Sequence, residues 1–270
     1  MDKALGYEPG DSRFEFWAVH QNIMINNLQV YVINLKQDTE RLKNILYELN
    51  RQNIKNFEII EAVDAKAINK KDLNLSISKN KKFINPINTN MNNQEICCSL
   101  SHLKVYKKFI SSKFDYALIL EDDAVFIDYL TENLKKFLIE NFIHEKQIIL
   151  LSELWEFFKK PINKNNNYEI VNVANAVYSH AYLINKKAAI SISSFNYPVK
   201  TIADNFIIFK LYCEVKLLGL NPFLLKQDKK KFASTIPIGN KMNKVFLLKR
   251  SFYRLVNKIF RILGIFNSHK

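Results

Sequence analysis

The sequence predicts an α/β fold with a mainly parallel central sheet. Short apolar runs of β-forming residues alternate with segments whose apolar residues recur at helical spacing, as in chains that build parallel sheets. One apolar run, 117–120, meets three consecutive carboxylates, which would repel one another in a core and therefore indicate the exposed end of a strand. With 270 residues, 48% of them hydrophobic, the chain is long enough for one large domain.

The first elements alternate strand, helix and strand. Residues 28–35 form a β-rich run, and a helix with apolar residues at helical spacing starts at Asp38. A second strand, 57–63, leads to Asp64. Residues 66–93 are rich in Lys and Asn and have few apolar anchors, so we expect a long basic excursion, either a solvated loop or a flap over the site.

The rest of the domain continues this alternation. A helical pattern runs from Gln94 to Ile110, and the strand 116–120 then leads to the three acids. The later candidates are a strand at 148–151, a loop from Pro161 to Asn167, two strand pieces at 176–178 and 181–184 around His180, a helix from Lys186 and a helix start at Phe206.

The two ends of the chain differ from this domain. Residues 1–27 mix turn-forming residues with aromatics without a clean period, so we expect an N-terminal extension before a domain covering 28–240. From Val245, apolar residues lie on one helical side with Lys and Arg between them, which predicts a basic amphipathic C-terminal helix. Packing against the core is one alternative, but the basic bias and the aromatics favour 241–270 as a segment that associates with an anionic membrane surface.

The composition restricts the partners and the compartment. A formal charge of +14 and a pI near 9.5 call for an anionic partner: nucleic acid, a membrane surface or a phosphate-bearing substrate. No RNA- or DNA-binding motif is present, so we expect no nucleic acid partner. Three cysteines without CxxC spacing indicate a reduced, cytosolic compartment. Neither a signal peptide nor an apolar span of about 18 residues is visible, so we expect membrane contact to be peripheral.

The acidic triplet Glu121-Asp122-Asp123 is the strongest candidate for chemistry. In an open α/β sheet, ligands collect at the carboxyl ends of the strands, where these acids fall. Hard oxygen ligands suit Mg²⁺ or Mn²⁺, which bind through one or two carboxylates together with substrate phosphates. A helix N-cap or an exposed turn is the structural alternative.

A second candidate group lies just upstream, on the helix that precedes the acidic strand. Helical spacing brings Glu95, Ser99 and His102 toward one face. Cys97 and Cys98 fit small, inert hydrophobes, and a lone helical His is more often structural than catalytic.

Four segments, taken together, match a known family. They are Val32-Ile33-Asn34-Leu35 with Arg41 after it, Ala62-Val63-Asp64-Ala65, the run from Glu95 to His102, and the run from Ala117 to Asp123. In order and spacing the chain resembles family 25 glycosyltransferases, bacterial lipooligosaccharide-biosynthesis enzymes whose relatives include collagen galactosyltransferase domains. The match covers about 28–126 and continues more weakly, through 179–184 and Asp204, to about 236. The chain has Gln94-Glu95-Ile96-Cys97-Cys98 where the family commonly has Gly-Glu-Ile-Gly-Cys, and Ala65 replaces a frequent Gly.

The resemblance implies a GT-A fold, a nucleotide-sugar donor and inversion at the anomeric carbon. A divalent ion held by Asp123, with Glu121 or Asp122 nearby, would then stabilise the departing diphosphate. His180, in the family's small-His-Ala-Tyr segment, is expected across the cleft, where it contacts the metal or the diphosphate or is a structural histidine.

Inversion also needs a general base for the acceptor hydroxyl. We assign this role to Asp204, which precedes the apolar run from Phe206 in a helix-start pattern, with an N-cap as the alternative or additional role.

Donor contacts are expected from the loops after the first two strands and from the helix before the acids. The candidates are Asn34, Arg41, Asp64, Glu95, Ser99 and His102. Arg41 suits a phosphate through its planar fork, although it would also fit a solvated helix charge, and Asn34 and Asp64 would also fit turns.

These assignments predict an inverting, metal-dependent glycosyltransferase that uses Mn²⁺ or Mg²⁺. We expect it to move a hexose, galactose from UDP-galactose by family frequency, onto a lipooligosaccharide acceptor at the cytoplasmic face of the bacterial inner membrane. UDP-glucose is the nearest alternative, because a few hydrogen bonds decide between C4 epimers. A noncatalytic glycan- or anion-binding module of the same fold is the alternative from another class.

Overall fold

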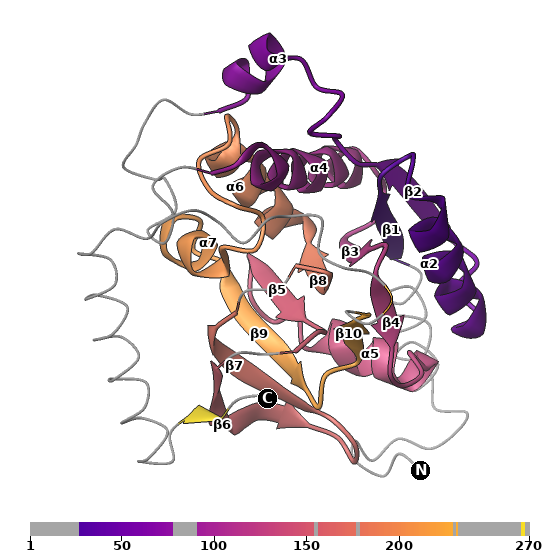
Figure 1. Cartoon of the computed structure of the whole chain (residues 1–270). Coiled ribbons are helices and arrows are strands. Elements are labelled where there is room, and N and C mark those ends of the chain that lie inside the picture. Colours follow the sequence, from indigo (N-terminus) through magenta and orange to yellow (C-terminus); the bar gives the residue numbers. More distant parts are fainter. Residues whose placement is uncertain are drawn as a thin grey trace.

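The computed structural model describes residues 27–77, 91–153, 156–176, 179–228 and 231, together with the strand pair 266–267. Figure 1 shows the helices and strands in these residues. In chain order they are β1 (Leu28–Asn34), α2 (Thr39–Arg51), β2 (Phe57–Glu61), α3 (Lys70–Leu75), α4 (Asn93–Ile110), β3 (Tyr116–Glu121), β4 (Ala124–Phe126), α5 (Glu132–Glu140), β5 (Gln147–Leu150), β6 (Glu156–Lys164), β7 (Glu169–Asn175), β8 (Ala181–Asn185), α6 (Lys186–Asn196), α7 (Phe206–Tyr212), β9 (Lys216–Asn221), β10 (Leu225–Gln227) and β11 (Phe266–Asn267).

A large sheet forms the centre of the molecule, in the order β11-β6-β7-β9-β5-β8-β3-β1-β2. Strand β1 pairs in parallel with β2 and β3, and β5 pairs in parallel with β9. Strand β8 runs antiparallel between β3 and β5, and β7 runs antiparallel to β9. The predicted α/β class is therefore confirmed, with β1, β2, β3, β5 and β9 all pointing one way and antiparallel strands making the sheet mixed.

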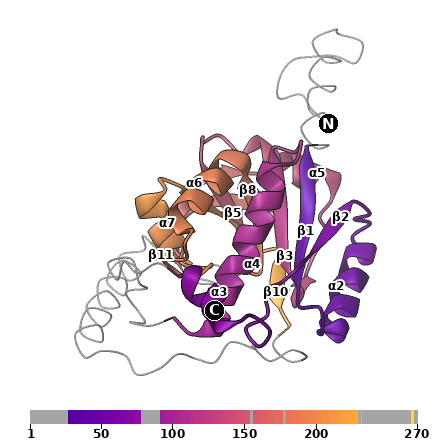
Figure 2. The ribbon, with the colours of Figure 1, turned by 90° about the horizontal axis from the view of Figure 1, so that it is seen from above.

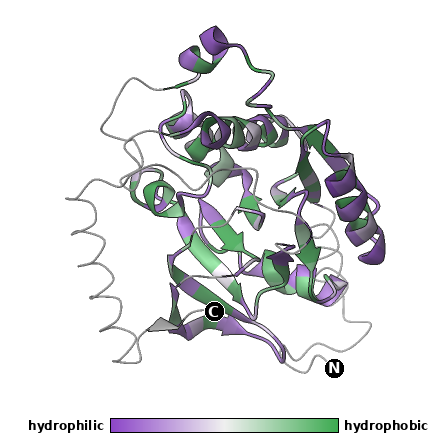
Figure 3. Ribbon diagram, in the orientation of Figure 1, coloured by the Kyte–Doolittle hydropathy of each residue, from purple (hydrophilic) through white to green (hydrophobic). Residues whose placement is uncertain are grey.

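Helices cover both faces of this sheet. Helices α4, α6 and α7 contribute to one apolar cluster, together with Tyr31 and Ile33 of β1. Helices α2 and α5 contribute to the other, together with Val30 and Val32. Because successive residues of a strand point to opposite faces, a strand covered on both sides is apolar throughout. Figure 2 shows the helices on the two sides, and Figure 3 shows hydrophobic strands inside hydrophilic outer helix surfaces.

The parallel strands bring three chain segments to one edge of the sheet. Strands β1, β2 and β3 end at Asn34, Glu61 and Glu121, and their registers align these carboxyl ends. Helix α4 runs to the start of β3 and begins in a capping box, in which the Asn92 side chain accepts from the Glu95 amide and the Glu95 carboxylate accepts from the Asn92 amide. The carboxyl edge of β1, β2 and β3 is therefore where a site can form.

Most predicted elements are confirmed, but helix α3 lies within the excursion expected as a loop or flap at 66–93, and two further predictions were wrong. The strands expected at 28–35, 57–63, 116–120 and 148–151 and the helices from Asp38, Gln94, Lys186 and Phe206 are present with small shifts in their ends. The loop expected from Pro161 to Asn167 is instead strand β6 up to Lys164, followed by a tight turn. Pro161 is tolerated because the ladder between β6 and β7 is irregular on both sides of it.

The second correction concerns Phe266, which falls within the amphipathic helix expected from Val245. It lies in β11, which pairs antiparallel with Phe157 and Phe158 of β6. The rest of the predicted 241–270 segment, the extension before Asn27, residues 78–90 of the basic excursion and 177–178 of the strand piece before His180 lie outside the described residues. Within the described part of the chain, no helix is both long and apolar enough to span a membrane.

Candidate active site

The three acids lie where strand β3 ends. Glu121 is the last residue of β3, and Asp122 and Asp123 form the turn into β4. Strand β4 pairs with β10, and the Asp228 amide donates to the Asp123 carbonyl at 3.1 Å. This acidic turn, Glu121 to Asp123, is thus held by the central sheet on one side and by the small β4–β10 sheet on the other.

Asp122 is fixed by two residues that precede it by more than eighty positions. The Asn34 amide donates to its Oδ2 at 2.8 Å, and Arg41 Nη1 donates to its Oδ1 at 3.0 Å. Burial raises the pKa of Asp122 to about 6, although the hydrogen bonds from Arg41 and Asn34 and the Arg41 charge act in the opposite direction. Asp122 is therefore held in a fixed position, but burial disfavours its ionised form.

Asp123 has one satisfied oxygen and one that is not. Its Oδ2 accepts from Arg41 Nη1 at 3.0 Å and from Gln227 Nε2 at 2.8 Å. Its Oδ1 is buried and has no hydrogen-bond partner among the described residues. Burial and the charge of Glu121 raise the pKa of Asp123. An unsatisfied buried carboxylate oxygen beside another carboxylate is the arrangement that a cation stabilises.

Glu121 has different partners from the two aspartates. Its Oε1 accepts from Ser179 Oγ at 2.7 Å and lies 3.3 Å from His102 Nε2. Burial opposes ionisation, but the hydrogen bond and charge of His102 and the Ser179 hydrogen bond outweigh it, so the pKa of Glu121 is lowered. Glu121 is the acid that stays ionised.

A line of buried hydrogen bonds leads from α4 and β8 to Glu121. Tyr106 OH and Tyr182 OH are 2.7 Å apart, and Tyr182 OH is 2.8 Å from His102 Nδ1. Because a carboxylate only accepts, His102 donates from Nε2, its Nδ1 accepts from Tyr182, and Tyr182 accepts from Tyr106. The two tyrosines thus set the tautomer of His102 toward Glu121.

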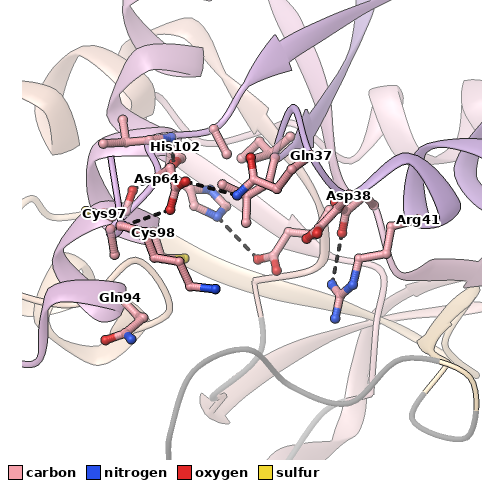
Figure 4. Close-up of a pocket in the computed structure, with 17 residues that line it drawn as sticks. Gln37, Asp38, Arg41, Asp64, Gln94, Cys97, Cys98 and His102 are labelled. Atoms are coloured by element: carbon pink, nitrogen blue, oxygen red, sulfur yellow. Dashed lines mark hydrogen bonds and ion pairs between the residues drawn. The ribbon is translucent and has the colours of Figure 1, made fainter. Parts of the chain in front are cut away.

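The cavity beside the acidic turn has a volume of about 350 Å³. It is lined by the ends of β1 and β2, the start of α2 and one face of α4, and Arg41, Asp64, His102, Glu121 and Asp122 all border it. Figure 4 shows the Arg41 guanidinium on one side of the cavity and His102 with the cysteines of α4 on the other. The structure therefore brings five of the ten predicted donor and metal residues to the lining of one cavity, whereas Asn34, Glu95, Ser99, Asp123 and His180 do not line it.

Asp64 lines this cavity and is held in place by two hydrogen bonds. Its Oδ2 accepts from Gln37 Nε2 at 3.0 Å, and its Oδ1 accepts from the Lys66 amide at 2.8 Å. Gln37 was not predicted, and no motif in the sequence marks it. Gln227 was also missed, because it reaches Asp123 from a strand more than one hundred residues away.

Glu95 and Ser99 do not line the cavity. The Glu95 carboxylate is used in the capping box of α4, and Ser99 Oγ donates to the carbonyls of Glu95 and Thr201 at 2.9 and 3.2 Å. Ser99 therefore joins α4 to the loop that carries Asp204. Of the three predicted residues on this helix, only His102 reaches the cavity.

His180 lies just before β8, next to the end of β3. It is buried, its carbonyl accepts from the Glu121 amide at 2.9 Å, and its Nε2 is 3.5 Å from Glu153 Oε2. Its charge, when present, would lower the pKa of both Glu121 and Asp123. Ser179 and Tyr182, in the same His-Ala-Tyr segment, also contact the Glu121 network.

Asp204 lies just before α7 and does not line the cavity. Burial and the charge of Glu121 raise its pKa to about 7, with a smaller contribution from Glu95. The N-cap of α7 is Asn205 and has no side-chain capping bond, so the N-cap alternative for Asp204 was wrong. The negative charge of Glu121 in the acidic turn thus favours the protonated form of the Asp204 carboxyl group.

These residues fit a hard divalent cation. Glu121 and Asp123 supply carboxylate oxygens, one of them without a hydrogen-bond partner among the described residues. Carboxylate and imidazole ligands suit Mn²⁺ or Mg²⁺ with additional water or phosphate ligands.

The comparison with protein families decides the class. A model of glycosyltransferase family 25, described as LPS biosynthesis proteins, matches residues 27–207. The chain belongs to glycosyltransferase family 25. The matched range contains β1 to β8, the acidic turn and Asp204. The GT-A fold implied by the resemblance agrees with the α/β sheet described above.

Individual relatives are glycosyltransferases by name. Human procollagen galactosyltransferase 2 is 30% identical over 201 residues, which are 72% of this chain and 28% of that protein. A Haemophilus influenzae protein named as a glycosyltransferase is 26% identical over 208 residues, covering 73% of this chain and 70% of the other. This family 25 chain thus spans less than a third of the human relative.

Among solved structures, a Drosophila β-1,4-galactosyltransferase 7 variant in complex with manganese, UDP-Gal and xylobiose covers 82% of this chain and 78% of its own. The TM-score is 0.37 and the sequence identity 10%.

Proposed function

We propose that this glycosyltransferase is an inverting, metal-dependent enzyme that transfers a hexose, galactose from UDP-galactose, onto a lipooligosaccharide acceptor. The observation that carries the proposal is the acidic turn at the carboxyl end of β3, which borders a cavity together with Arg41 and Asp64. The name of the human relative, a procollagen galactosyltransferase, supports galactose. UDP-glucose is the competing donor.

The cavity would take the nucleotide of the donor. Asp64, held by Gln37 and the Lys66 amide, presents carboxylate oxygens that can accept from ribose or uracil. Arg41 borders the cavity, is bonded through Nη1 to Asp122 and Asp123 and has a side chain that is 13% exposed, so its positive charge would attract a diphosphate bound there. Asn34 orients Asp122, and we assign Glu95 and Ser99 to holding α4 rather than to direct contact.

Glu121 and Asp123, with His180, would hold the divalent ion. When bound, the ion supplies Lewis-acid stabilisation of the negative charge that develops on the leaving diphosphate. Asp122 stays paired with Arg41 and Asn34 and keeps the turn in place. His102, held by the line of hydrogen bonds from Tyr106 and Tyr182, keeps Glu121 ionised and oriented.

Asp204 is the proposed general base. With a pKa of about 7, its carboxylate has a proton affinity suited to taking the proton of an acceptor hydroxyl near neutral pH. The hydroxyl oxygen attacks the anomeric carbon from the face opposite the diphosphate, and the bond between that carbon and the diphosphate oxygen breaks. Ser99 holds the loop of Asp204 against α4.

The acceptor and the location are proposals of the same kind. A formal charge of +14 suits a phosphorylated glycolipid and an anionic membrane surface better than a neutral glycan. We place the enzyme at the cytoplasmic face of the bacterial inner membrane, bound peripherally through the basic segment 241–270.

The deciding experiment combines the full chain with a panel of UDP-sugars and Mn²⁺ or Mg²⁺, and measures UDP release with and without truncated lipooligosaccharide. Acceptor-dependent UDP release from UDP-galactose, absent in EDTA and in Asp123→Asn, is the expected result. Faster UDP release from UDP-glucose would show that glucose, and not galactose, is the sugar transferred. Ligand binding without release from any donor would favour the noncatalytic binding module, and full activity in EDTA would contradict metal dependence.

A further inference from the structure

A second set of possible metal ligands lies on the wall of the cavity, at the side formed by α4. Cys98 and His102 are one helical turn apart on α4, and Glu121 is the last residue of β3. One ligand atom from each of the three residues lies within 4.8 Å of the others. All three residues line the cavity, as Figure 4 shows for Cys98 and His102.

The geometry at His102 is that of a metal ligand. Its Nε2 is 3.3 Å from Glu121 Oε1. That is a long hydrogen bond, but it equals the separation of about 3.3 Å expected between two ligands of a tetrahedral ion with bonds of about 2.0–2.1 Å. The other ring nitrogen is held by Tyr182 OH at 2.8 Å, which is the outer hydrogen bond that ligating histidines usually make.

The electrostatic field around Cys98 favours a cation. Burial raises the pKa of the Cys98 thiol well above its usual value, and the charges of Glu121, Asp204 and Asp123 raise it further. The same negative field that disfavours a bare thiolate stabilises a dication placed next to the sulfur. The pKa of Cys97, one residue earlier, is raised by burial and by the charge of Asp64 instead, so the two cysteines face different charged groups.

We propose that Cys98, His102 and Glu121 form a Zn²⁺ site that is distinct from the Mn²⁺ or Mg²⁺ position proposed at Asp123. Thiolate and imidazole are ligands that Zn²⁺ prefers, whereas Mg²⁺ and Mn²⁺ prefer oxygen. Three protein ligands leave the fourth position open toward the cavity, for water or an anionic ligand.

Binding involves a defined proton balance. The Cys98 thiol gives its proton to solvent and forms the sulfur–zinc bond. The His102 proton is lost from Nε2 and one is taken up at Nδ1, so that Nδ1–H donates a hydrogen bond to the Tyr182 oxygen, the Tyr182 hydroxyl turns to donate to Tyr106, and the Tyr106 hydroxyl proton turns away from Tyr182. The hydrogen-bond line thus serves both states, and the net release is one proton per zinc.

The site has a consequence for turnover that rests on the proposed function. Glu121 belongs to both metal positions, so zinc at Cys98 withdraws it from the catalytic ion. Zn²⁺ should therefore inhibit transfer supported by Mn²⁺.

Cobalt(II) provides a direct test on the full chain, because it takes zinc sites and reports thiolate coordination by its charge-transfer absorption. We expect one equivalent of Co²⁺ to give the thiolate band and the intense visible bands of a tetrahedral ion, and Zn²⁺ to displace it. Cys98→Ser should abolish the thiolate band, whereas Cys97→Ser should keep it. A band that survives in Cys98→Ser, or only the weak spectrum of octahedral cobalt in the wild type, would overturn the proposal.

A second variant tests the outer partner. Tyr182→Phe removes the hydrogen bond to His102 Nδ1 but leaves all three ligands, so Zn²⁺ affinity in a chelator competition should fall by about 10- to 100-fold while the cobalt thiolate band remains. Unchanged affinity would contradict the assignment of Nε2 as the ligand. Circular dichroism of each variant checks that the fold is retained.

These spectra need no turnover and so separate the two proposals. A cobalt spectrum that depends on Cys98 in a protein without transferase activity would support the zinc site and reject the proposed function. In an active preparation, Zn²⁺ should inhibit the wild type and Cys97→Ser at saturating Mn²⁺ and lose its effect in Cys98→Ser. Equal inhibition of all three would place zinc elsewhere.

Discussion

Asn34 and Asp122 are 88 residues apart in the chain and are joined by a 2.8 Å hydrogen bond between Nδ2 and Oδ2. The bond connects the end of β1 to the acidic turn after β3, across two neighbouring parallel strands. It explains why the Asp122 carboxylate stays buried although burial is unfavourable. The sheet fixes the turn, and Asn34 and Arg41 supply hydrogen-bond donors in place of the water that burial removes.

Asp122→Asn should change the pH dependence of stability. The folded protein holds the Asp122 proton up to about pH 6 rather than 3.8, so the stability that comes from this group is full at low pH and is lost as the pH rises through 6. The variant lacks this loss. Its free energy of unfolding relative to the wild type should increase by roughly 2 kcal/mol between pH 4.5 and pH 7.5.

Urea unfolding in EDTA at the two pH values measures this difference. Asp128→Asn is the matched control: the hydrogen bond from Tyr168 lowers the pKa of Asp128, so this group is ionised in both the folded and the unfolded state above pH 4.5, and the difference between this variant and wild type should stay nearly constant between the two pH values. The same difference between Asp122→Asn and wild type at both pH values would show that Asp122 is not protonated in the fold.

Asp123→Asn should lose metal-dependent transfer. The substitution keeps one oxygen for Arg41 and Gln227 but removes the charge beside the unpartnered Oδ1. Removing one charge from a preorganised site usually lowers kcat by about 10²–10³-fold. Metal titration of UDP release should show the loss, with Asp128→Asn retaining the wild-type value and unfolding midpoints showing that both variants fold. Wild-type metal dependence in Asp123→Asn would remove this residue from the metal site.

Asp204→Asn should abolish the acid limb of the pH profile. A base must be ionised to act, so kcat/KM should rise tenfold per pH unit below the pKa of Asp204 and level off above it. That pKa is about 7 in the metal-free protein, and a bound dication lowers it, so the apparent value should lie at or below 7. The asparagine variant should be slower by about 10²–10⁴-fold, without this limb.

The control for Asp204 is Glu214→Gln, an exposed acid after α7 that pairs only with Lys146 in the described contacts. It should keep the wild-type profile. Transfer by Asp204→Asn at the wild-type rate, with donor bound, would assign the base to another residue.

The sequence predicted strands β1, β2, β3, β5 and β8 and the acidic turn because each rests on local pattern: apolar runs covered on both faces, and acids that cannot remain in a core. It did not predict β6, β7 and β9, or the short strands β4 and β10, whose pairing joins segments about one hundred residues apart. It grouped Glu95 with His102 by helical spacing, but spacing cannot show that the Glu95 carboxylate is already used in the capping box. The hydrogen bond from Tyr182 to His102 could have been predicted, because Tyr182 belongs to the His-Ala-Tyr segment.

Glu95→Ala distinguishes a donor contact from a cap. The structure uses this carboxylate at the N-terminus of α4, so the variant should lose about 1 kcal/mol of stability while its affinity for UDP stays within about twofold. Urea unfolding and UDP binding by calorimetry measure the two quantities. A tenfold loss of UDP affinity at unchanged stability would restore Glu95 as a donor-binding residue.

The proposed membrane contact is best tested by neutralising charges rather than by truncation. Strand β11 pairs with β6, so deleting the C-terminal segment would also remove a strand from the sheet. Replacing Lys249, Arg250, Arg254, Lys258 and Arg261 with Gln keeps β11. Since each basic residue near an anionic surface contributes about 1 kcal/mol, the variant should bind vesicles containing phosphatidylglycerol at least about tenfold more weakly, and the wild type should lose binding in high salt. Activity on a soluble acceptor should change little, because these positions lie outside the family match. Equal sedimentation of the variant and the wild type with the vesicles would show that the segment is not the membrane contact.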